Sequence, residues 1–98
     1  MSTTAIKKEK ILLVEDTRAM QIVIQSLLGP IYDLTCVDTL NQAEAALKAD
    51  SFSLLLLDVV LPDGDGFDFC EKLRKDSSML NLPIIFLTSK NEVQDRVR

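Results

Sequence analysis

Carboxylates follow two of the most aliphatic runs in the sequence. Glu15 and Asp16 come directly after Ile11–Val14, and Asp58 comes directly after Ser53–Leu57. Runs of this kind are typical of strands that are buried on both faces of a parallel sheet. Because functional sites in open parallel sheets form outside the carboxyl ends of the strands, we expect these three carboxylates to lie together.

Two hydroxyl side chains stand in the same position after a further run, since Thr88 and Ser89 follow Pro83–Leu87. Carboxylates that lie close together repel one another, and a divalent cation relieves that repulsion. Mg²⁺ is the natural candidate, because it takes one or two carboxylates, keeps several waters and leaves room for phosphate oxygens. An aspartate beside such a metal can attack phosphorus and form an acyl phosphate.

Each of these acidic residues also has a purely structural explanation. Asp16 can serve as the N-cap of the helix that follows it, and Asp58 can be a turn aspartate. Asp63 and Asp65 lie in a segment rich in Pro, Gly and Asp, where such residues are more typical of turns and caps than of metal sites. The observation that favours a site is the joint placement of carboxylates and a hydroxyl at strand ends.

The segment that begins at Asp63 resembles the start of an EF-hand loop, but its continuation does not fit. Counting from Asp63, the sixth position is Asp68, where a glycine is required, and the twelfth is Arg74, where a glutamate is required. We therefore exclude calcium binding by this route. The sequence also has no glycine-rich phosphate loop and no dinucleotide fingerprint.

The composition excludes several classes of protein. The 98 residues, 47% of them apolar and 27% charged, are typical of one small globular domain. The sequence has no histidine, which excludes histidine-based catalysis and histidine-ligated zinc, and its two cysteines are too few for a disulfide scaffold. The net charge of −4 argues against direct binding to nucleic acid. No apolar stretch has the length of a membrane span or a signal peptide, so we expect a cytoplasmic domain without a membrane partner.

Strand and helix patterns alternate along the chain. Thr39 is a plausible N-cap for the second helix, and a fourth helix is expected to begin at Asn91. The order βαβαβαβα predicts an α/β protein with a parallel sheet and right-handed crossovers. The expected strands are 11–14, 32–37, 53–57 and 83–87. The residues expected to face inward are Met20, Val23, Ile24, Leu27 and Leu28 in the first helix, Leu40, Ala43 and Leu47 in the second, and Phe67, Cys70 and Leu73 in the third.

The segments that carry the acidic residues resemble one known family, the receiver domains of two-component response regulators. The matching segments are ILLVED at 11–16, LLLLDVVLPDGDG at 54–66 and PIIFLTS at 83–89. Their order and spacing are specific when they occur together. The resemblance implies a flavodoxin-like doubly wound parallel sheet, with the receiver domain at 10–98. The polar, lysine-rich segment 1–9 is expected to be a flexible tail.

The resemblance also implies a role for each residue at the strand ends. Asp58 would accept a phosphoryl group from a histidine kinase or a phosphotransfer protein. Glu15 and Asp16 would hold Mg²⁺ together with Asp58 and the backbone carbonyl of Val60. Thr88 would be the switch hydroxyl that turns toward the phosphoryl oxygens. The domain would be a switch and not a turnover enzyme, with only Mg²⁺-dependent self-phosphotransfer and autodephosphorylation.

The family ordinarily has a fifth strand, with a lysine that pairs with the phosphoacceptor, and a fifth helix. We expect the chain up to Arg98 to be truncated, with four strands and about three and a half helices. Because the lysine that pairs with the phosphoacceptor is then missing, we expect weaker phosphorylation than in a complete receiver. Its fourth strand would be an exposed edge, which predicts a homodimer through that strand and the fourth helix. The alternative is a phosphorylation-independent interaction or dimerisation module. A metal-dependent phosphohydrolase is disfavoured, because Val60 stands where such enzymes commonly place an acid.

Overall fold

Four parallel strands form the main sheet of the computed structural model, which describes residues 7–87. Each expected strand is present within one residue of its expected bounds, because an aliphatic run fits a strand that is covered on both faces. The strands are β1 (Lys10–Val14), β2 (Asp33–Val37), β3 (Leu54–Asp58) and β6 (Ile84–Leu87), and their order in the sheet is β2-β1-β3-β6.

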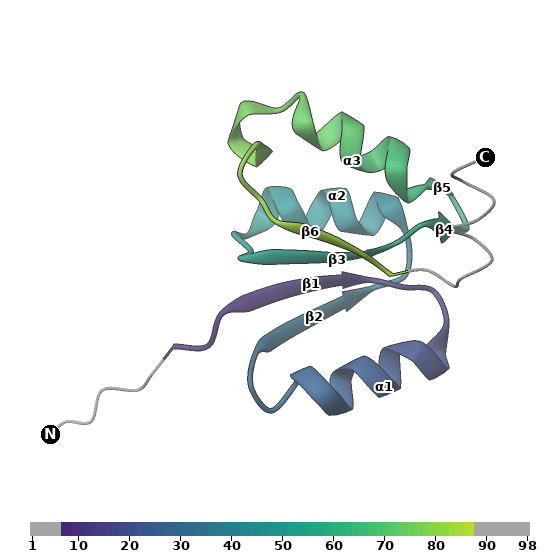
Figure 1. Cartoon of the computed structure of the whole chain (residues 1–98), viewed down its shortest axis with the longest axis vertical. Helices are drawn as coiled ribbons and strands as arrows, with labels where there is room; N and C mark the ends of the chain where they lie inside the picture. The colour runs from purple at the N-terminus through teal and green to yellow at the C-terminus, as the bar shows by residue number, and fades with distance from the viewer. Residues whose placement is uncertain (1–6, 88–98) are drawn as a thin grey trace, which may run out of the picture.

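Helices cover both faces of this sheet (Figure 1). One face carries α1 (Arg18–Leu28), and the other carries α2 (Leu40–Ala49) and α3 (Gly66–Arg74). This arrangement confirms the predicted doubly wound parallel α/β fold for the described residues. The fourth helix that was predicted from Asn91 lies outside them. Within residues 7–87, no helix is both long enough and apolar enough to cross a membrane.

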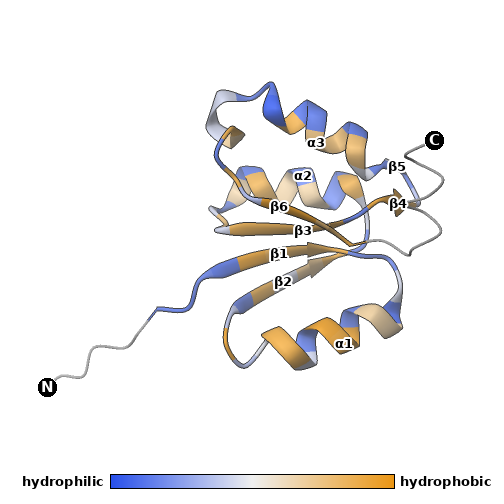
Figure 2. Ribbon diagram, viewed as in Figure 1, coloured by the Kyte–Doolittle hydropathy of each residue, from blue (hydrophilic) through white to orange (hydrophobic). Residues whose placement is uncertain are grey.

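The core lies mainly between the sheet and the helices α2 and α3. Leu12, Val14, Leu55 and Leu57 are fully buried and point to that side of the sheet. On the α1 side, the buried cluster is smaller and consists of Ile11, Leu13, Ile24 and Leu56. Figure 2 shows the corresponding band of hydrophobic residues along β1, β3 and β6.

The predicted inward face of α1 is only partly correct. Ile24 is buried and Leu28 is half-buried, but Met20, Val23 and Leu27 are 45%, 51% and 66% exposed. The inward line of the helix also contains Gln21, which is only 8% exposed. The apolar residues of α1 lie along two adjacent lines on the helix surface. Only one of these lines packs against the sheet. Figure 2 shows how hydrophobic this helix is along most of its length.

The other two helices agree better with the prediction. Ala43 and Leu47 of α2 are buried, and Thr39 is its N-cap in a complete capping box with Gln42. In α3 the prediction placed Phe67, Cys70 and Leu73 inward. Leu73 is buried, but Phe67 and Cys70 are half-buried and Phe69, which was not predicted, is 5% exposed.

The segment Val59–Gly66, predicted as a loop, contains a short antiparallel hairpin. Its strands are β4 (Val60–Leu61) and β5 (Gly64–Asp65), with Pro62 and Asp63 at the turn. Leu61 is 7% exposed and belongs to the larger core cluster. The hairpin is therefore attached to the core, which a reading of turn residues alone does not reveal.

We predict that Leu57→Ala destabilises the domain by about 2–5 kcal/mol, because it removes buried methyl groups and leaves a cavity. Leu27→Ala makes the same chemical change at an exposed position and is expected to alter the free energy of unfolding by no more than about 0.5 kcal/mol. Urea unfolding followed by circular dichroism measures both. Equal effects of the two substitutions would contradict the placement of the core.

Candidate metal and phosphoacceptor site

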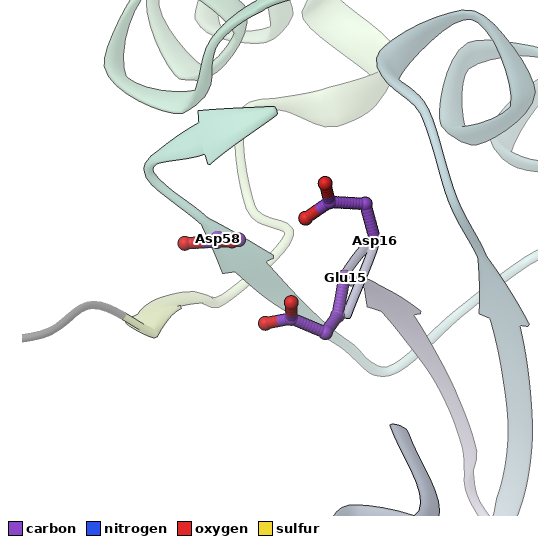
Figure 3. A group of neighbouring side chains, drawn as sticks. All are labelled: Glu15, Asp16 and Asp58. Carbon is purple, nitrogen blue, oxygen red and sulfur yellow. The ribbon is translucent and has the colours of Figure 1, made fainter. Parts of the chain in front are cut away.

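Three carboxylates meet at the carboxyl edge of the sheet. β1 and β3 are adjacent and parallel, with Val14 in register with Leu57, so the residues that follow each strand emerge side by side. One carboxylate oxygen from each of Glu15, Asp16 and Asp58 lies within 4.8 Å of the other two. Figure 3 shows the three side chains at the ends of β1 and β3. The clustering that the strand ends predicted is therefore present.

Glu15 is the buried member of the cluster and is held by hydrogen bonds. It is 5% exposed, and its Oε2 accepts a hydrogen bond of 2.9 Å from the backbone N–H of Thr17. Its own backbone N–H donates to the carbonyl of Val37 in β2, at 3.0 Å. These bonds fix both the backbone and the carboxylate of Glu15 at the point where the chain leaves β1.

Asp16 and Asp58 differ in their exposure. Asp16 is exposed at the start of the connection to α1, whereas Asp58 is half-buried at the end of β3, in register with Leu87. The next residue, Val59, is 1% exposed and donates its backbone N–H to the carbonyl of Leu87, at 3.3 Å. Asp58 therefore projects from a backbone that is held by β6 on one side.

Gly66 lets the chain return close to Asp58. The backbone N–H of Gly66 donates to the carbonyl of Val59 at 2.6 Å, which closes the hairpin at its base. A Cβ atom at position 66 would lie 2.4 Å from the backbone carbonyl oxygen of Asp58 and 3.1 Å from the Cα of Val59. Only glycine permits this approach, so the position of Asp58 depends on a residue that lacks a side chain.

Gln21 is a residue of this region that the sequence reasoning missed. Its side-chain N–H groups donate to the backbone carbonyl of Glu15 and to Asp38 Oδ1, the latter at 2.7 Å. Gln21 thereby links the segment after β1 to the segment after β2. The signal was available, because a glutamine occupied the inward line of α1, three residues before Ile24.

Asp63 and Asp65 are helix caps and do not belong to the carboxylate cluster, as their turn-rich context predicted. Asp65 is the N-cap of α3 and accepts from the backbone N–H of Phe67 at 2.7 Å. Asp63 accepts from the backbone N–H groups of Leu40 and Asn41, at the start of α2. These two backbone hydrogen bonds hold the pKa of the Asp63 carboxyl below its ordinary value.

Two predicted site residues remain to be placed. Val60 lies in β4, two residues beyond Asp58, with a 50% exposed side chain, so its contribution to a site would come from its backbone. Thr88, the predicted switch hydroxyl, lies outside the described residues and directly follows Leu87 of β6.

The carboxylate cluster has the donor set and the size of a site for a small divalent cation. Two oxygens on opposite sides of an octahedral ion with bonds of about 2.1 Å lie about 4.2 Å apart. One oxygen from each carboxylate lies within 4.8 Å of the other two, which is close to this span. Three carboxylates also supply the hard oxygen ligands that such cations prefer.

Comparison with known proteins identifies the family. The family model of the response regulator receiver domain matches residues 11–98. The chain belongs to this family. It is a receiver domain of two-component signalling, and receiver domains interact with histidine kinases or phosphotransfer proteins and bind a divalent metal.

Among similar proteins, the probable transcriptional regulator ycf27 of Porphyridium aerugineum is 34% identical over 92 residues. The match covers 93% of this chain and 37% of that protein, so this receiver domain spans little more than a third of the relative's length.

Two solved structures are similar to the receiver domain over most of its length. The phosphorylated cyanobacterial phytochrome response regulator RcpA matches with a TM-score of 0.80 at 29% identity, covering 91% of this chain and 71% of that one. The Mn²⁺-bound form of the response regulator Rcp1 matches with a TM-score of 0.76 at 28% identity, covering 88% and 70%.

We predict that Gly66→Ala displaces the end of β3 and destabilises the receiver domain by about 1–3 kcal/mol, because the added methyl group meets the carbonyl of Asp58. The measurements are the urea midpoint and the amide resonances of Asp58 and Val59. Ser26→Ala, at an exposed position of α1, should leave both unchanged. Wild-type stability and resonances in Gly66→Ala would show that the approach is not tight.

Proposed function

We propose that Asp58 is the phosphoacceptor of this receiver domain. The observation that carries the proposal is the position of its carboxylate, which lies at the end of a buried central strand within 4.8 Å of both members of the acidic pair. A nucleophile in this position is half-buried, and the next residue, Val59, is held by backbone hydrogen bonds to Leu87 and Gly66. The membership of the chain in the receiver family supports the same assignment.

The proposed reaction is phosphoryl transfer from a phosphohistidine. A carboxylate oxygen of Asp58 attacks the phosphorus, the P–N bond breaks, and its electron pair goes to the imidazole nitrogen of the donor. The product is an acyl phosphate on Asp58, and hydrolysis by water returns the carboxylate and inorganic phosphate. The residues of this chain position the nucleophile. The phosphoryl group is the only group that the domain takes from the donor.

We assign the metal as Mg²⁺, held by the carboxylates of Glu15, Asp16 and Asp58 and by the backbone carbonyl of Val60. When bound, Mg²⁺ neutralises charge on the transferring phosphoryl oxygens. Glu15 contributes a buried carboxylate fixed by Thr17, whereas the exposed Asp16 supplies the adjustable ligand. The Mn²⁺-bound form of the similar response regulator Rcp1 supports a divalent ion at a receiver of this kind.

The remaining roles follow from the same assignment. We propose that Thr88 is the switch hydroxyl, that the phosphoryl donor is a histidine kinase or a phosphotransfer protein, and that the domain acts in the cytoplasm as a switch and not as a turnover enzyme. Phosphorylation adds about two negative charges at Asp58, and this change supplies the signal.

We also propose that the domain forms homodimers through the region of β6. In the described part of the chain, β6 is an edge of the sheet and its Ile85 is 53% exposed. An apolar edge strand is a template for pairing with a second chain. Sedimentation equilibrium that shows only monomer at high protein concentration would contradict this proposal.

Asp58→Asn is expected to abolish incorporation of acid-labile phosphate from acetyl phosphate, because an amide oxygen is not a competent nucleophile. Mass spectrometry of the intact protein measures the added phosphoryl group. Asp68→Asn changes an exposed aspartate of α3 and serves as the control, with labelling as in the wild type. If Asp58→Asn retains the label, the phosphoacceptor is another residue. If the wild type takes up none in the presence of Mg²⁺, the phosphorylation-independent alternative is favoured.

Asp16→Asn is expected to weaken the binding of Mn²⁺, used as a paramagnetic substitute for Mg²⁺, by at least about tenfold. The substitution removes a charged ligand at an exposed position and should leave the fold intact. Electron paramagnetic resonance of free Mn²⁺ measures the dissociation constant. Asp38→Asn removes a charge at the neighbouring strand end without removing a proposed ligand, and its effect should be much smaller. Equal effects would indicate a general field of negative charge and not a coordinated ion.

A further inference from the structure

Asp63 connects the segment after the phosphoacceptor to a helix that is distant in the sequence. It lies at the turn of the β4–β5 hairpin, five residues after Asp58. Its Oδ1 accepts from the backbone N–H of Leu40 at 2.8 Å, and its Oδ2 accepts from that of Asn41 at 2.9 Å. Both carboxylate oxygens of one side chain therefore bind the first turn of α2.

The first turn of α2 needs these two bonds. A helix leaves its first four backbone N–H groups without partners inside the helix. Two of them are paired by the capping box, since Thr39 Oγ1 accepts from the backbone N–H of Gln42 at 3.1 Å and Gln42 Oε1 accepts from the backbone N–H of Thr39 at 3.2 Å. Asp63 accepts from the remaining two, and its negative charge also interacts favourably with the positive end of the helix dipole.

Close packing accompanies these hydrogen bonds. A Cβ atom at Gly64 would lie 2.9 Å from Cδ1 of Leu40, so the turn of the hairpin rests directly on α2. At its other end, the hairpin is attached to α3 through the cap that Asp65 forms with Phe67 at 2.7 Å. Two carboxylates thus attach one short hairpin to two helices.

The segment held between these attachments contains the proposed carbonyl ligand. Val60 lies in β4, between Asp58 and the turn at Asp63, and pairs with Asp65 across the hairpin. A metal site is tight when its ligands are held in place before the ion arrives. The orientation of the Val60 carbonyl relative to Asp58 depends on where the hairpin is held.

We propose that Asp63 is a positioning residue of the metal site, which holds the β4–β5 hairpin against α2 and thereby orients the backbone ligand beside Asp58. This proposal rests on the proposed function, because it assumes the divalent ion at the acidic cluster. Asp63 does not touch the ion. It acts through the hairpin, so its removal changes the affinity for the ion while the three carboxylates remain.

The test is the dissociation constant of Mn²⁺, measured by electron paramagnetic resonance, for Asp63→Ala and Asp63→Asn in the full chain. Asp63→Ala removes both acceptors and should weaken binding about tenfold, at the low end of what the loss of an outer-shell partner costs. Asp63→Asn keeps one acceptor oxygen and should lie between Asp63→Ala and the wild type. This order ties the loss of affinity to the acceptor oxygens of residue 63, and the controls below separate positioning from stability.

Two controls separate positioning from stability. Asp76→Ala removes a similar exposed aspartate cap, which binds Ser78 at 3.0 Å at the start of the 3₁₀ turn Ser77–Met79. Thr39→Ala removes the other side-chain cap of α2 and leaves the hairpin attached. Thermal unfolding should show that all of these variants lose some stability, whereas only the Asp63 variants should lose affinity for Mn²⁺.

The outcomes are distinguishable. If the wild type binds Mn²⁺ and the Asp63 variants bind it equally well, Asp63 is only a helix cap and the inference is wrong. If Thr39→Ala weakens binding as much as Asp63→Ala, the stability of α2 and not the attachment of the hairpin is responsible, and the inference is again wrong. If the wild type itself does not bind Mn²⁺, the proposed metal site fails first.

Discussion

The parallel pairing of β1 with β3 is the constraint on which the site depends. Val14 lies opposite Leu57, so the chain leaves both strands at the same level of the sheet and three carboxylates emerge together. A shift of one residue in this register would turn each side chain to the opposite face and separate the acidic pair from Asp58. The aliphatic side chains that stabilise the pairing of β1 with β3 therefore also bring the three negative charges together.

The segment that follows Asp58 is held in place by backbone hydrogen bonds and by a close approach of the backbone. Val59 bonds to β6 and to Gly66, and the tight approach of Gly66 leaves no space for a side chain. Beyond this point the hairpin is attached to α2 and α3 by carboxylates that bind helix N-termini. In this domain aspartates have two different tasks, since some gather at the sheet edge and others hold the loop that surrounds it.

The parts of the fold and site that were predictable from sequence are those set by local pattern. The strands could be placed because β1 and β3 are uninterrupted aliphatic runs, and the acidic cluster could be placed because strand ends in a parallel sheet share one edge. The contacts of Asp63 with α2 and of Gln21 with Asp38 could not be predicted, because they join residues that are 22–23 and 17 positions apart and have no periodic signal. The exposed line of α1 was mistaken for a buried one, because periodicity identifies apolar lines and not what covers them.

The uneven distribution of buried residues has a consequence for motion. Among residues 7–87, the α2 and α3 side of the sheet has ten buried residues in its cluster, whereas the α1 side has four. Local opening costs least where few apolar contacts are lost, so the amide hydrogens of α1 should exchange with solvent before those of α2 and α3. Glu15 and Asp16 lie on the connection that leads into this less tightly packed helix, while Asp58 is followed by the hairpin whose Leu61 belongs to the larger cluster. Slow fluctuations of the acidic cluster should therefore move Asp16 against a nearly stationary Asp58.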